Sequence, residues 1–236
     1  MTFLSAEWRK LALANYEVDP NILMPYLPHG TELDFWNGRC YVSLVGFMFK
    51  NVRLLGVPVP FHTEFEEVNL RFYVRHKSDG EWRRGVVFVS ELVPKIAVAF
   101  VANTVYREHY ETVPMRHVWK NDGIAQTIEY DWKKQGRWHS FHLEAAINPF
   151  PIPPGSEAEF ITEHYWGYAK FSETQTNEYQ VTHPRWEVYE VKSHKIDVDF
   201  AKLYGPSFAE LNQLKPTSIM LAEGSGITIE NKRRIG

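Results

Sequence analysis

Hydrophobic and polar residues alternate along much of this chain, and a repeat of two residues is typical of β-strands. The clearest case runs from Phe65 to Arg75, where Val68, Leu70, Phe72 and Val74 alternate with Glu67, Asn69, Arg71, Tyr73 and Arg75. The pattern predicts a strand with one apolar face and one polar face.

Short turn signals divide the chain into further strands. Asn37-Gly38 suits a type I′ turn and predicts a hairpin over residues 33–42, with the second strand continuing to Phe49. Gly46 within that strand indicates a bulge or a close approach of another group to the backbone. Asp79-Gly80 predicts a turn into a strand over residues 82–92.

A third hairpin is predicted around Gln135-Gly136, between strands over residues 127–132 and 137–145. The proline-rich stretch 149–154 interrupts the pattern, and strands are predicted after it at residues 159–171, 185–192 and 219–230. Three basic residues, Lys232 to Arg234, indicate a solvated tail.

Two helices are predicted. Pro94 suits a helix start, and the apolar run from Ile96 to Ala102 predicts a buried helix over residues 94–106. A second, short helix is predicted within residues 197–214, interrupted at Gly205-Pro206. The fold class is therefore mainly β, with a minor α component of a few short helices.

Composition narrows the class of protein. Hydrophobic residues make up 44% of the 236 residues and aromatic residues 15%, which excludes disordered and low-complexity chains. The length suits one domain, and no period of repetition is seen, so residues 1–236 are expected to form a single domain.

The charge balance argues against several partners. With 26 Lys and Arg against 29 Asp and Glu, the net charge is -3, so neither nucleic acid nor an anionic membrane is an expected partner. The longest apolar run is far shorter than a membrane-spanning helix, and residues 1–10 do not resemble a secretory signal. Cys40 is the only cysteine. We expect a cytoplasmic protein and leave homo-oligomer formation open.

No cofactor or metal is predicted. Gly224-Ser225-Gly226 has the wrong spacing for a serine-hydrolase elbow, a phosphate-binding loop or a dinucleotide fingerprint. His139 and His142 are three residues apart, which on a strand points them to opposite faces and disfavours a shared metal. Cys40 is expected to be a buried, inert thiol. His164, within Glu163-His164-Tyr165, is interpreted as a structural residue.

Longer motifs carry a family resemblance. They are Phe65-Glu66-Glu67-Val68-Asn69-Leu70-Arg71-Phe72-Tyr73-Val74, Arg83-Arg84-Gly85-Val86-Val87-Phe88 and Glu91-Leu92-Val93-Pro94-Lys95. With these motifs the chain resembles the YqjF-like family of uncharacterised bacterial proteins, over most of its length. The resemblance implies a fold similar to acetoacetate decarboxylase: a cone-like antiparallel β-barrel whose interior holds a small acid or ketone.

The resemblance also marks Lys95 as a candidate catalytic residue. In acetoacetate decarboxylase a lysine after a proline forms a Schiff base, and Pro94-Lys95 resembles that motif. Ile96 stands where the decarboxylase has a second lysine, which removes a cation that would lower the pKa of Lys95. Glu91, four residues earlier, is an alternative partner that would keep Lys95 charged, as a structural or ligand-pairing cation.

The predicted strand 65–75 supplies the other candidates. Arg71 is the best carboxylate anchor, with Glu67 and Tyr73 on the same face as substrate-binding residues; the alternative is that this face is solvated. Glu66 falls on the apolar face, where burial would raise its pKa enough for a general acid, unless it marks a bulge. His183 is a candidate cavity-lining residue.

Two functions of different kinds follow. In the first, the barrel is an enzyme that acts on a small carboxylate or carbonyl compound, with Lys95 forming an imine or acting electrostatically and Glu66, Glu67 or Glu91 handling protons. This function predicts that Lys95 and Arg71 face one cavity. The alternative is a non-catalytic small-molecule binding barrel. A weaker third option is an interaction protein that uses an exposed sheet edge.

Overall fold

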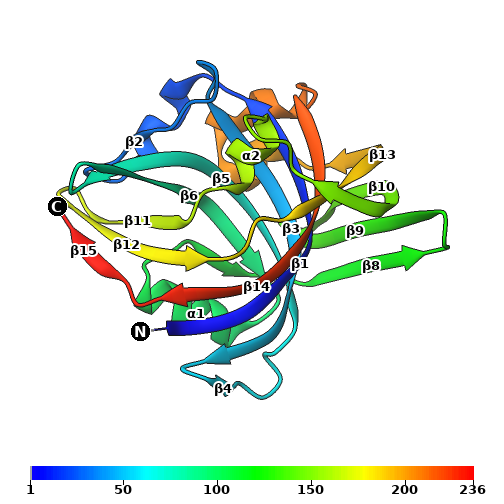
Figure 1. The fold of residues 1–236 in the computed structure, drawn as a ribbon, viewed down its shortest axis with the longest axis horizontal. Helices are drawn as coiled ribbons and strands as arrows, with labels where there is room; N and C mark the ends of the chain where they lie inside the picture. The colour runs from blue at the N-terminus through cyan, green and yellow to red at the C-terminus, as the bar shows by residue number, and fades with distance from the viewer. Residues whose placement is uncertain (1) are drawn as a thin grey trace.

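A computed structural model of the protein describes residues 2–236, and in it one twisted sheet of fifteen strands curls into a cone (Figure 1). In chain order the strands are β1 (Thr2–Glu17), β2 (Glu32–Leu33), β3 (Tyr41–Leu54), β4 (Val57–Pro58), β5 (Phe65–Ser78), β6 (Glu81–Val93), β7 (Tyr110–Thr112), β8 (Met115–Asn121), β9 (Ala125–Lys134), β10 (Arg137–Pro151), β11 (Trp166–Ser172), β12 (Gln175–Thr182), β13 (Glu187–Asp197), β14 (Ser218–Glu230) and β15 (Arg233–Ile235). The helices are α1 (Ile96–Val105), α2 (Glu157–Thr162) and α3 (Phe200–Tyr204), with short 3-10 turns at Pro20–Ile22, Met24–Tyr26 and Pro206–Asn212.

The strand pairings close a ring. The sheet runs in the order β12-β11-β6-β5-β3-β1-β14, and β14 pairs again with β12 through Val181 and Ile229. All neighbours in this ring are antiparallel except β6 and β11, which pair in parallel at Gly85 and Trp166. The mainly β, cone-like fold expected from the sequence is therefore confirmed.

Alternation along β5 divides the hydrophobic core in two. Val68, Leu70 and Phe72 belong to one buried cluster, which also includes Tyr130 of β9. Tyr73 belongs to a second cluster on the other face of the sheet. The polar row at Glu67, Asn69 and Arg71 shares the face of Tyr73 and is buried, so it is not a solvated face.

Most of the predicted strands and turns are confirmed. Asp79 and Gly80 have φ values of 53° and 86° at the β5–β6 turn, and Gln135 and Gly136 have φ values of 53° and 78° between β9 and β10. Gly46 does permit a close approach, because a Cβ there would lie 2.8 Å from Cδ2 of Tyr130.

The first predicted hairpin is much shorter than expected. Asn37 and Gly38 form the turn with positive φ, but the only pairing across it is between Trp36 and Arg39. Leu33 pairs instead with Val74 of β5.

The prediction that the helix after Pro94 is buried is wrong. Helix α1 occupies the expected place, yet Ile96 is 75% exposed and Phe100 is 69% exposed. None of the helices within residues 2–236 has the length and apolar character needed to cross a membrane.

Other corrections concern the second half of the chain. Strand β10 continues through the proline-rich stretch to Pro151, because that stretch pairs with β13. Residues 157–162 form α2 rather than a strand, capped by the Ser156 side chain. The basic residues near the C-terminus are not a free tail, because β15 pairs with β12 and Arg233 forms an ion pair with Glu178.

Candidate functional site

An interior cavity of about 60 Å³ lies inside the ring of strands. Its polar lining residues are Glu67, Asn69, Arg71, Glu91, Tyr110, Thr162, His164, Tyr179 and His183, and its aromatic walls include Trp8, Phe47, Phe88 and Trp186. One water needs roughly 10–15 Å³ of such space, so the cavity suits an occupant of only a few heavy atoms.

Arg71 is the cation of this cavity. Its side chain reaches the interior from β5 and is 8% exposed. Nη2 donates to the backbone oxygen of Ile161 at 3.5 Å, whereas Nε has no hydrogen-bond partner among the described residues. The guanidinium carbon lies 5.8 Å from the centre of the Tyr73 ring. Among residues 2–236 no carboxylate forms an ion pair with Arg71, so its Nε donor remains available to an anionic ligand.

Three glutamates and two tyrosines form a polar cluster, of which all but Glu108 line the cavity. Glu67 accepts hydrogen bonds from Nδ2 of Asn69 at 2.9 Å and from the hydroxyl of Tyr110 at 3.0 Å. Glu108 accepts one from the hydroxyl of Tyr179 at 2.6 Å. Glu91 is the cross-strand neighbour of Asn69, and its Oε2 has no hydrogen-bond partner among the described residues.

Burial changes the protonation of these glutamates. It raises the pKa of Glu67 to about 7, against the hydrogen bonds from Asn69 and Tyr110 and the charge of Arg71. It raises the pKa of Glu108 to about 8. For Glu91, burial and then the charges of Glu108 and Glu67 raise the pKa well above its ordinary value. A protonated Glu91 carries a proton that it can donate into the cavity.

His164 lines the same cavity and is held by Asp34. Its Nε2 lies 3.1 Å from Oδ2 of Asp34, which also accepts a hydrogen bond from Nε of Arg84 at 2.6 Å. Burial raises the pKa of Asp34, but the hydrogen bonds from His164 and Arg84 outweigh it and hold that pKa below its ordinary value. Nε2 therefore donates to a carboxylate.

The same geometry leaves His164 a free basic nitrogen. Burial lowers the pKa of His164 to about 4, against the hydrogen bond to Asp34, so the ring is neutral at pH 7. Nδ1 has no hydrogen-bond partner among the described residues. A neutral histidine that donates through one nitrogen accepts through the other, so Nδ1 is a buried acceptor without a partner among the described residues.

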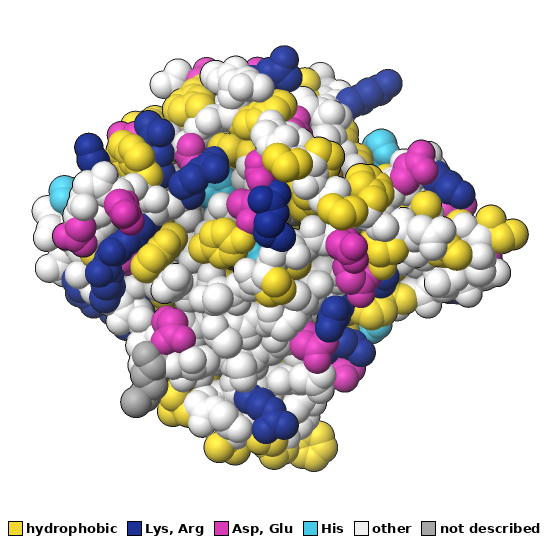
Figure 2. Space-filling view, in the orientation of Figure 1, with side chains coloured by type: hydrophobic (Ala, Val, Ile, Leu, Met, Phe, Trp, Pro, Cys, Tyr) yellow, Lys and Arg dark blue, Asp and Glu magenta, His cyan; other side chains and the backbone are white. Residues whose placement is uncertain are grey.

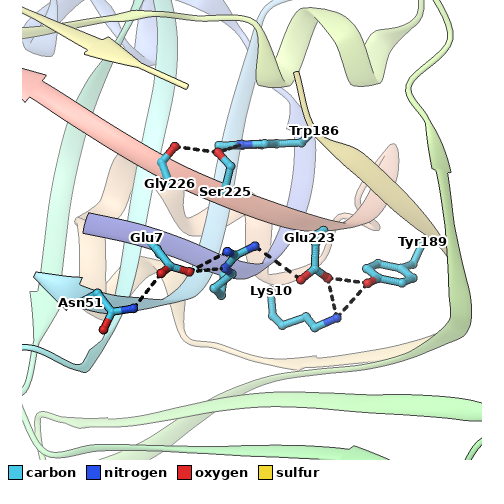
Figure 3. A network of polar contacts seen from close by, with 9 residues as sticks. Glu7, Lys10, Asn51, Trp186, Tyr189, Glu223, Ser225 and Gly226 are labelled. Atoms are coloured by element: carbon cyan, nitrogen blue, oxygen red, sulfur yellow. Dashed lines mark hydrogen bonds and ion pairs between the residues drawn. The ribbon is translucent and has the colours of Figure 1, made fainter. Parts of the chain in front are cut away.

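His183 and Trp186 form another wall. Their rings stack with centroids 4.2 Å apart, and Nδ1 of His183 lies 2.9 Å from the backbone oxygen of Pro184. Nε1 of Trp186 donates to Oγ of Ser225 at 2.9 Å (Figure 3). Ser225, which has no role in a nucleotide motif, thus fixes an aromatic wall of the cavity.

A polar network along β1 supports this wall from outside the cavity (Figure 3). Nζ of Lys10 lies 2.7 Å from Oε2 of Glu223, and Tyr189 bonds to the same carboxylate. Glu7 accepts from Nδ2 of Asn51 at 2.7 Å. These contacts tie β1 to β3, β13 and β14, the strands on which the wall rests.

The sequence candidates separate into two groups. Arg71, Glu67, Glu91 and His183 line the cavity, whereas Lys95 and Glu66 do not. Lys95 is the N-cap residue of α1. The enzyme function with Lys95 as imine-forming or electrostatic residue predicts that Lys95 and Arg71 face one cavity, and Lys95 is not among the residues that line the cavity of Arg71.

Glu66 and Tyr73 also have other surroundings. Oε1 of Glu66 lies 2.6 Å from Nδ1 of His117. Burial raises the pKa of Glu66, but the hydrogen bond from His117, with smaller effects that include the charge of Lys95, holds it below its ordinary value, so the expected high pKa is wrong. Its pairing with Met48 is regular, without a bulge. The Tyr73 hydroxyl bonds to Oγ of Ser43 at 2.6 Å, behind the cavity wall.

The remaining candidates have structural surroundings. Burial raises the pKa of the Cys40 thiol to about 11, in keeping with the buried position expected for it. His139 stacks on Trp132, while His142 lies 3.8 Å from Glu129. Within residues 2–236, no group of three His, Cys, Asp or Glu side chains is placed to hold a metal ion.

Sequence reasoning did not identify Asp34, Glu108, Tyr110 or Tyr179, and it interpreted His164 as structural. No local spacing connects these residues. Asp34 and His164 are 130 positions apart, and Tyr179 and Glu108 are 71 apart. The one local signal was the polar pair at Glu163-His164 in an aromatic-rich segment.

Comparisons with known proteins agree with this fold. The model of the DUF2071 family, described as an uncharacterized conserved protein, matches residues 5–226. The uncharacterized protein YqjF of Bacillus subtilis (strain 168) is 28% identical over 165 residues, which cover 70% of this chain and 66%, just under two thirds, of that protein.

Solved structures extend the likeness to the whole chain. Acetoacetate decarboxylase from Legionella pneumophila has a TM-score of 0.67 at 13% identity, over 99% of this chain and 87% of that one. The enduracididine biosynthesis enzyme MppR complexed with pyruvate also has a TM-score of 0.67, at 12% identity, over 100% and 91% of the two chains. An acetoacetate decarboxylase-like enzyme from Sphingomonas wittichii RW1 gives 0.67 at 12% identity, over 100% and 94%. At these identities the likeness is one of fold.

Proposed function

Because the chain belongs to the DUF2071 family of uncharacterized conserved proteins and has an acetoacetate decarboxylase-like fold, we propose that its cavity binds a small carboxylate with a carbonyl group and transfers protons on it without a covalent imine. The proposal keeps the substrate class and the anchoring role of Arg71 from the enzyme function, and it gives Lys95 no role. A lysine-based imine has less support, because no lysine is among the residues that line the cavity.

The observation that carries this proposal is the state of Arg71. A buried guanidinium without a carboxylate partner is costly unless something else satisfies it. Nε is unpartnered, and the side chain faces a cavity of a few heavy atoms' size. A planar carboxylate can accept from the free Nε with one oxygen and from Nη2, whose contact with the Ile161 oxygen is as long as 3.5 Å, with the other.

The neutral residues around Arg71 divide the acid and base roles. Nδ1 of His164 would accept the proton from the carbon next to the ligand's carbonyl group, and protonated Glu91 would donate its proton to the carbonyl oxygen. The ligand becomes an enol, while His164 becomes an imidazolium and Glu91 a carboxylate. The step needs no further reactant, and its reversal restores both residues.

A solved structure of similar fold supports the ligand class. MppR is described as complexed with pyruvate, which is a small carboxylate with a carbonyl group. The polar residues of this chain suit such a molecule by their chemistry: one cation for the carboxylate, and an acid and a base for the carbonyl side.

Pyruvate binding tests the anchoring role. We expect calorimetric titration to show binding to the wild type and a loss of at least about tenfold in affinity in Arg71→Gln, because a charge-assisted bidentate contact is lost. Arg75→Gln is the matched control, since Arg75 is on the same strand but pairs with Glu32 at the surface. Pyruvate binding that is equal in wild type and Arg71→Gln would contradict the proposal.

Deuterium exchange separates catalysis from binding alone. We expect the wild type to speed the exchange of pyruvate methyl hydrogens in D₂O, as followed by proton NMR. Binding that depends on Arg71 but gives no exchange with any keto acid tested would instead favour the non-catalytic binding barrel, which the absence of a lysine from the lining also suits.

A further inference from the structure

A second cavity, of about 180 Å³, lies beside the polar one. Helix α1 provides part of its wall through Ala97, Val98, Val101 and Ala102, and the opposite wall comes from apolar side chains of the N-terminal half of the chain: Phe3, Leu4, Phe49, Val52, Leu54 and Phe65. We call this cavity the apolar groove. The volume of the apolar groove is three times that of the polar cavity.

The groove and the polar cavity share a wall. Phe49, Tyr110, Tyr179 and Ile229 line both. The hydroxyl groups of Tyr110 and Tyr179 are taken up by Glu67 and Glu108, so the two tyrosines add mainly their rings to this wall. A ligand with its polar end in the polar cavity and its apolar end in the groove therefore has to displace side chains of this shared wall.

The segment that contributes Leu54, Val59 and His62 to the groove also carries exposed apolar side chains. The loop around β4 exposes Leu55, Val57 and Phe61, and Phe61 is 90% exposed. Figure 2 shows hydrophobic side chains gathered at the lower end of the molecule, where Figure 1 places β4. The groove offers few polar atoms, so an occupant gains by burying apolar surface and not by hydrogen bonding.

We propose that the ligand is an oxo acid with an unbranched alkyl tail, whose carboxylate pairs with Arg71 and whose tail lies in the apolar groove. The inference rests on the proposed function and names its substrate class. The polar cavity has room for the carboxylate and carbonyl groups, and the apolar groove adjoins it across the wall formed by Phe49, Tyr110, Tyr179 and Ile229. The tail adds affinity without any new polar contact.

A series of 2-oxo acids from pyruvate to 2-oxooctanoate tests the substrate class by calorimetry. We expect affinity for the wild type to rise with chain length, by up to about fourfold for each methylene group that leaves water. Val101→Trp should fill the groove, leave pyruvate binding unchanged and abolish the rise. Thr104→Trp is the control, since Thr104 is exposed on the same helix and lines neither cavity. Ala102→Phe replaces Val101→Trp if the latter does not fold.

The outcomes distinguish this inference from the proposed function. Equal affinity for all homologues, with pyruvate binding that still depends on Arg71, would overturn the alkyl-tail ligand and leave the function intact. A rise with chain length that persists in the groove-filling variants would also overturn it, because the tail would lie elsewhere. If no member of the series binds, both proposals fail. Dimerisation that buries the groove, seen by light scattering, would assign that surface to a second copy and overturn the inference.

Discussion

Nε2 of His164 lies 3.1 Å from Oδ2 of Asp34. Asp34 follows β2 and His164 follows α2, so the two residues come from distant parts of the chain. Arg84 balances the charge of Asp34 from the other side, with Nε at 2.6 Å from the same oxygen. The carboxylate therefore selects the tautomer of His164, and the imidazole remains neutral because burial lowers its pKa to about 4.

This pair predicts how proton transfer responds to substitution. In His164→Gln we expect methyl exchange of bound pyruvate to slow by at least about 100-fold, because the base is lost, while pyruvate affinity changes little. In Asp34→Asn we expect a smaller decrease in the exchange rate, because the carboxylate that fixes which nitrogen of His164 carries the proton is lost. Proton NMR in D₂O gives the rates, and His142→Gln, on the half-exposed residue near Glu129, is the control. Wild-type rates in His164→Gln would exclude His164 as the base.

Glu108 predicts a pH dependence of stability. Its pKa in the folded protein is about 8, against 4.5 as the ordinary value. Between these values the folded state holds a proton that the unfolded state releases, so the free energy of unfolding falls as pH rises from 4.5 to 8. Glu108→Gln keeps a neutral acceptor for Tyr179 and removes this loss. We expect the variant to be more stable than the wild type at pH 8, by on the order of 4 kcal/mol, and nearly equal at pH 4.5.

Urea unfolding at the two pH values measures this difference. The exposed Glu210 provides the control, because Glu210→Gln makes the same chemical change outside the cluster. The pKa values of Glu67 and Glu91 are also raised, so some pH dependence of stability should remain in the variant. A Glu108→Gln protein destabilised equally at both pH values would contradict a protonated Glu108.

The parts of the fold that could be predicted are those with a clear local sequence pattern. Strand β5 alternates cleanly, and its turn into β6 carries Asp79-Gly80, so both could be placed from sequence. Strand β1 does not alternate, because its second half is buried on both faces and Lys10 interrupts it with a φ of 53°. Strand β12 contains Asn177 and Glu178, polar residues that are fully buried only because distant groups pair with them.

The residues of the candidate site divide in the same way, into those that a local sequence pattern indicates and those that it does not. Arg71 and Glu67 could be selected because strand parity places them on one face, and Glu91 because it lies four residues before Lys95 in the family motif. Asp34, Glu108 and His164 gain their chemistry from partners far away in sequence, which no spacing rule reveals. The family motif selected Lys95, but this residue is the N-cap of α1 and does not line the polar cavity.

Gly85 predicts a strict steric limit at the parallel junction of β6 and β11. A Cβ atom at this residue would lie 2.4 Å from the backbone oxygen of Trp166, and a backbone oxygen in a paired strand cannot move aside cheaply. We expect Gly85→Ala to lower the free energy of unfolding by on the order of 1–3 kcal/mol in urea. Gly226→Ala should have a much smaller effect, since nothing lies within 4 Å of a Cβ there. Equal effects of the two substitutions would refute the steric explanation.

Borohydride trapping decides between proton transfer alone and an imine at Lys95. Lys95 is at the start of α1 and does not line the polar cavity, so we expect no keto acid adduct on it by intact mass or peptide mapping. In Lys95→Gln we expect the pyruvate affinity and the exchange rate to stay within about twofold of the wild type, because Lys95 has no part in the proposed step. An acetoacetate decarboxylase treated in parallel confirms that the trapping works.

The opposite result would have a definite structural meaning. An imine on Lys95 requires its Nζ to reach the ligand's carbonyl carbon, and the described cavity has no lysine in its wall. A substrate-dependent adduct that disappears in Lys95→Gln would therefore mean that α1 moves on binding and carries Lys95 inward. It would also move the chemistry from the pair of His164 and Glu91 to a covalent intermediate, with Arg71 retained as the carboxylate anchor.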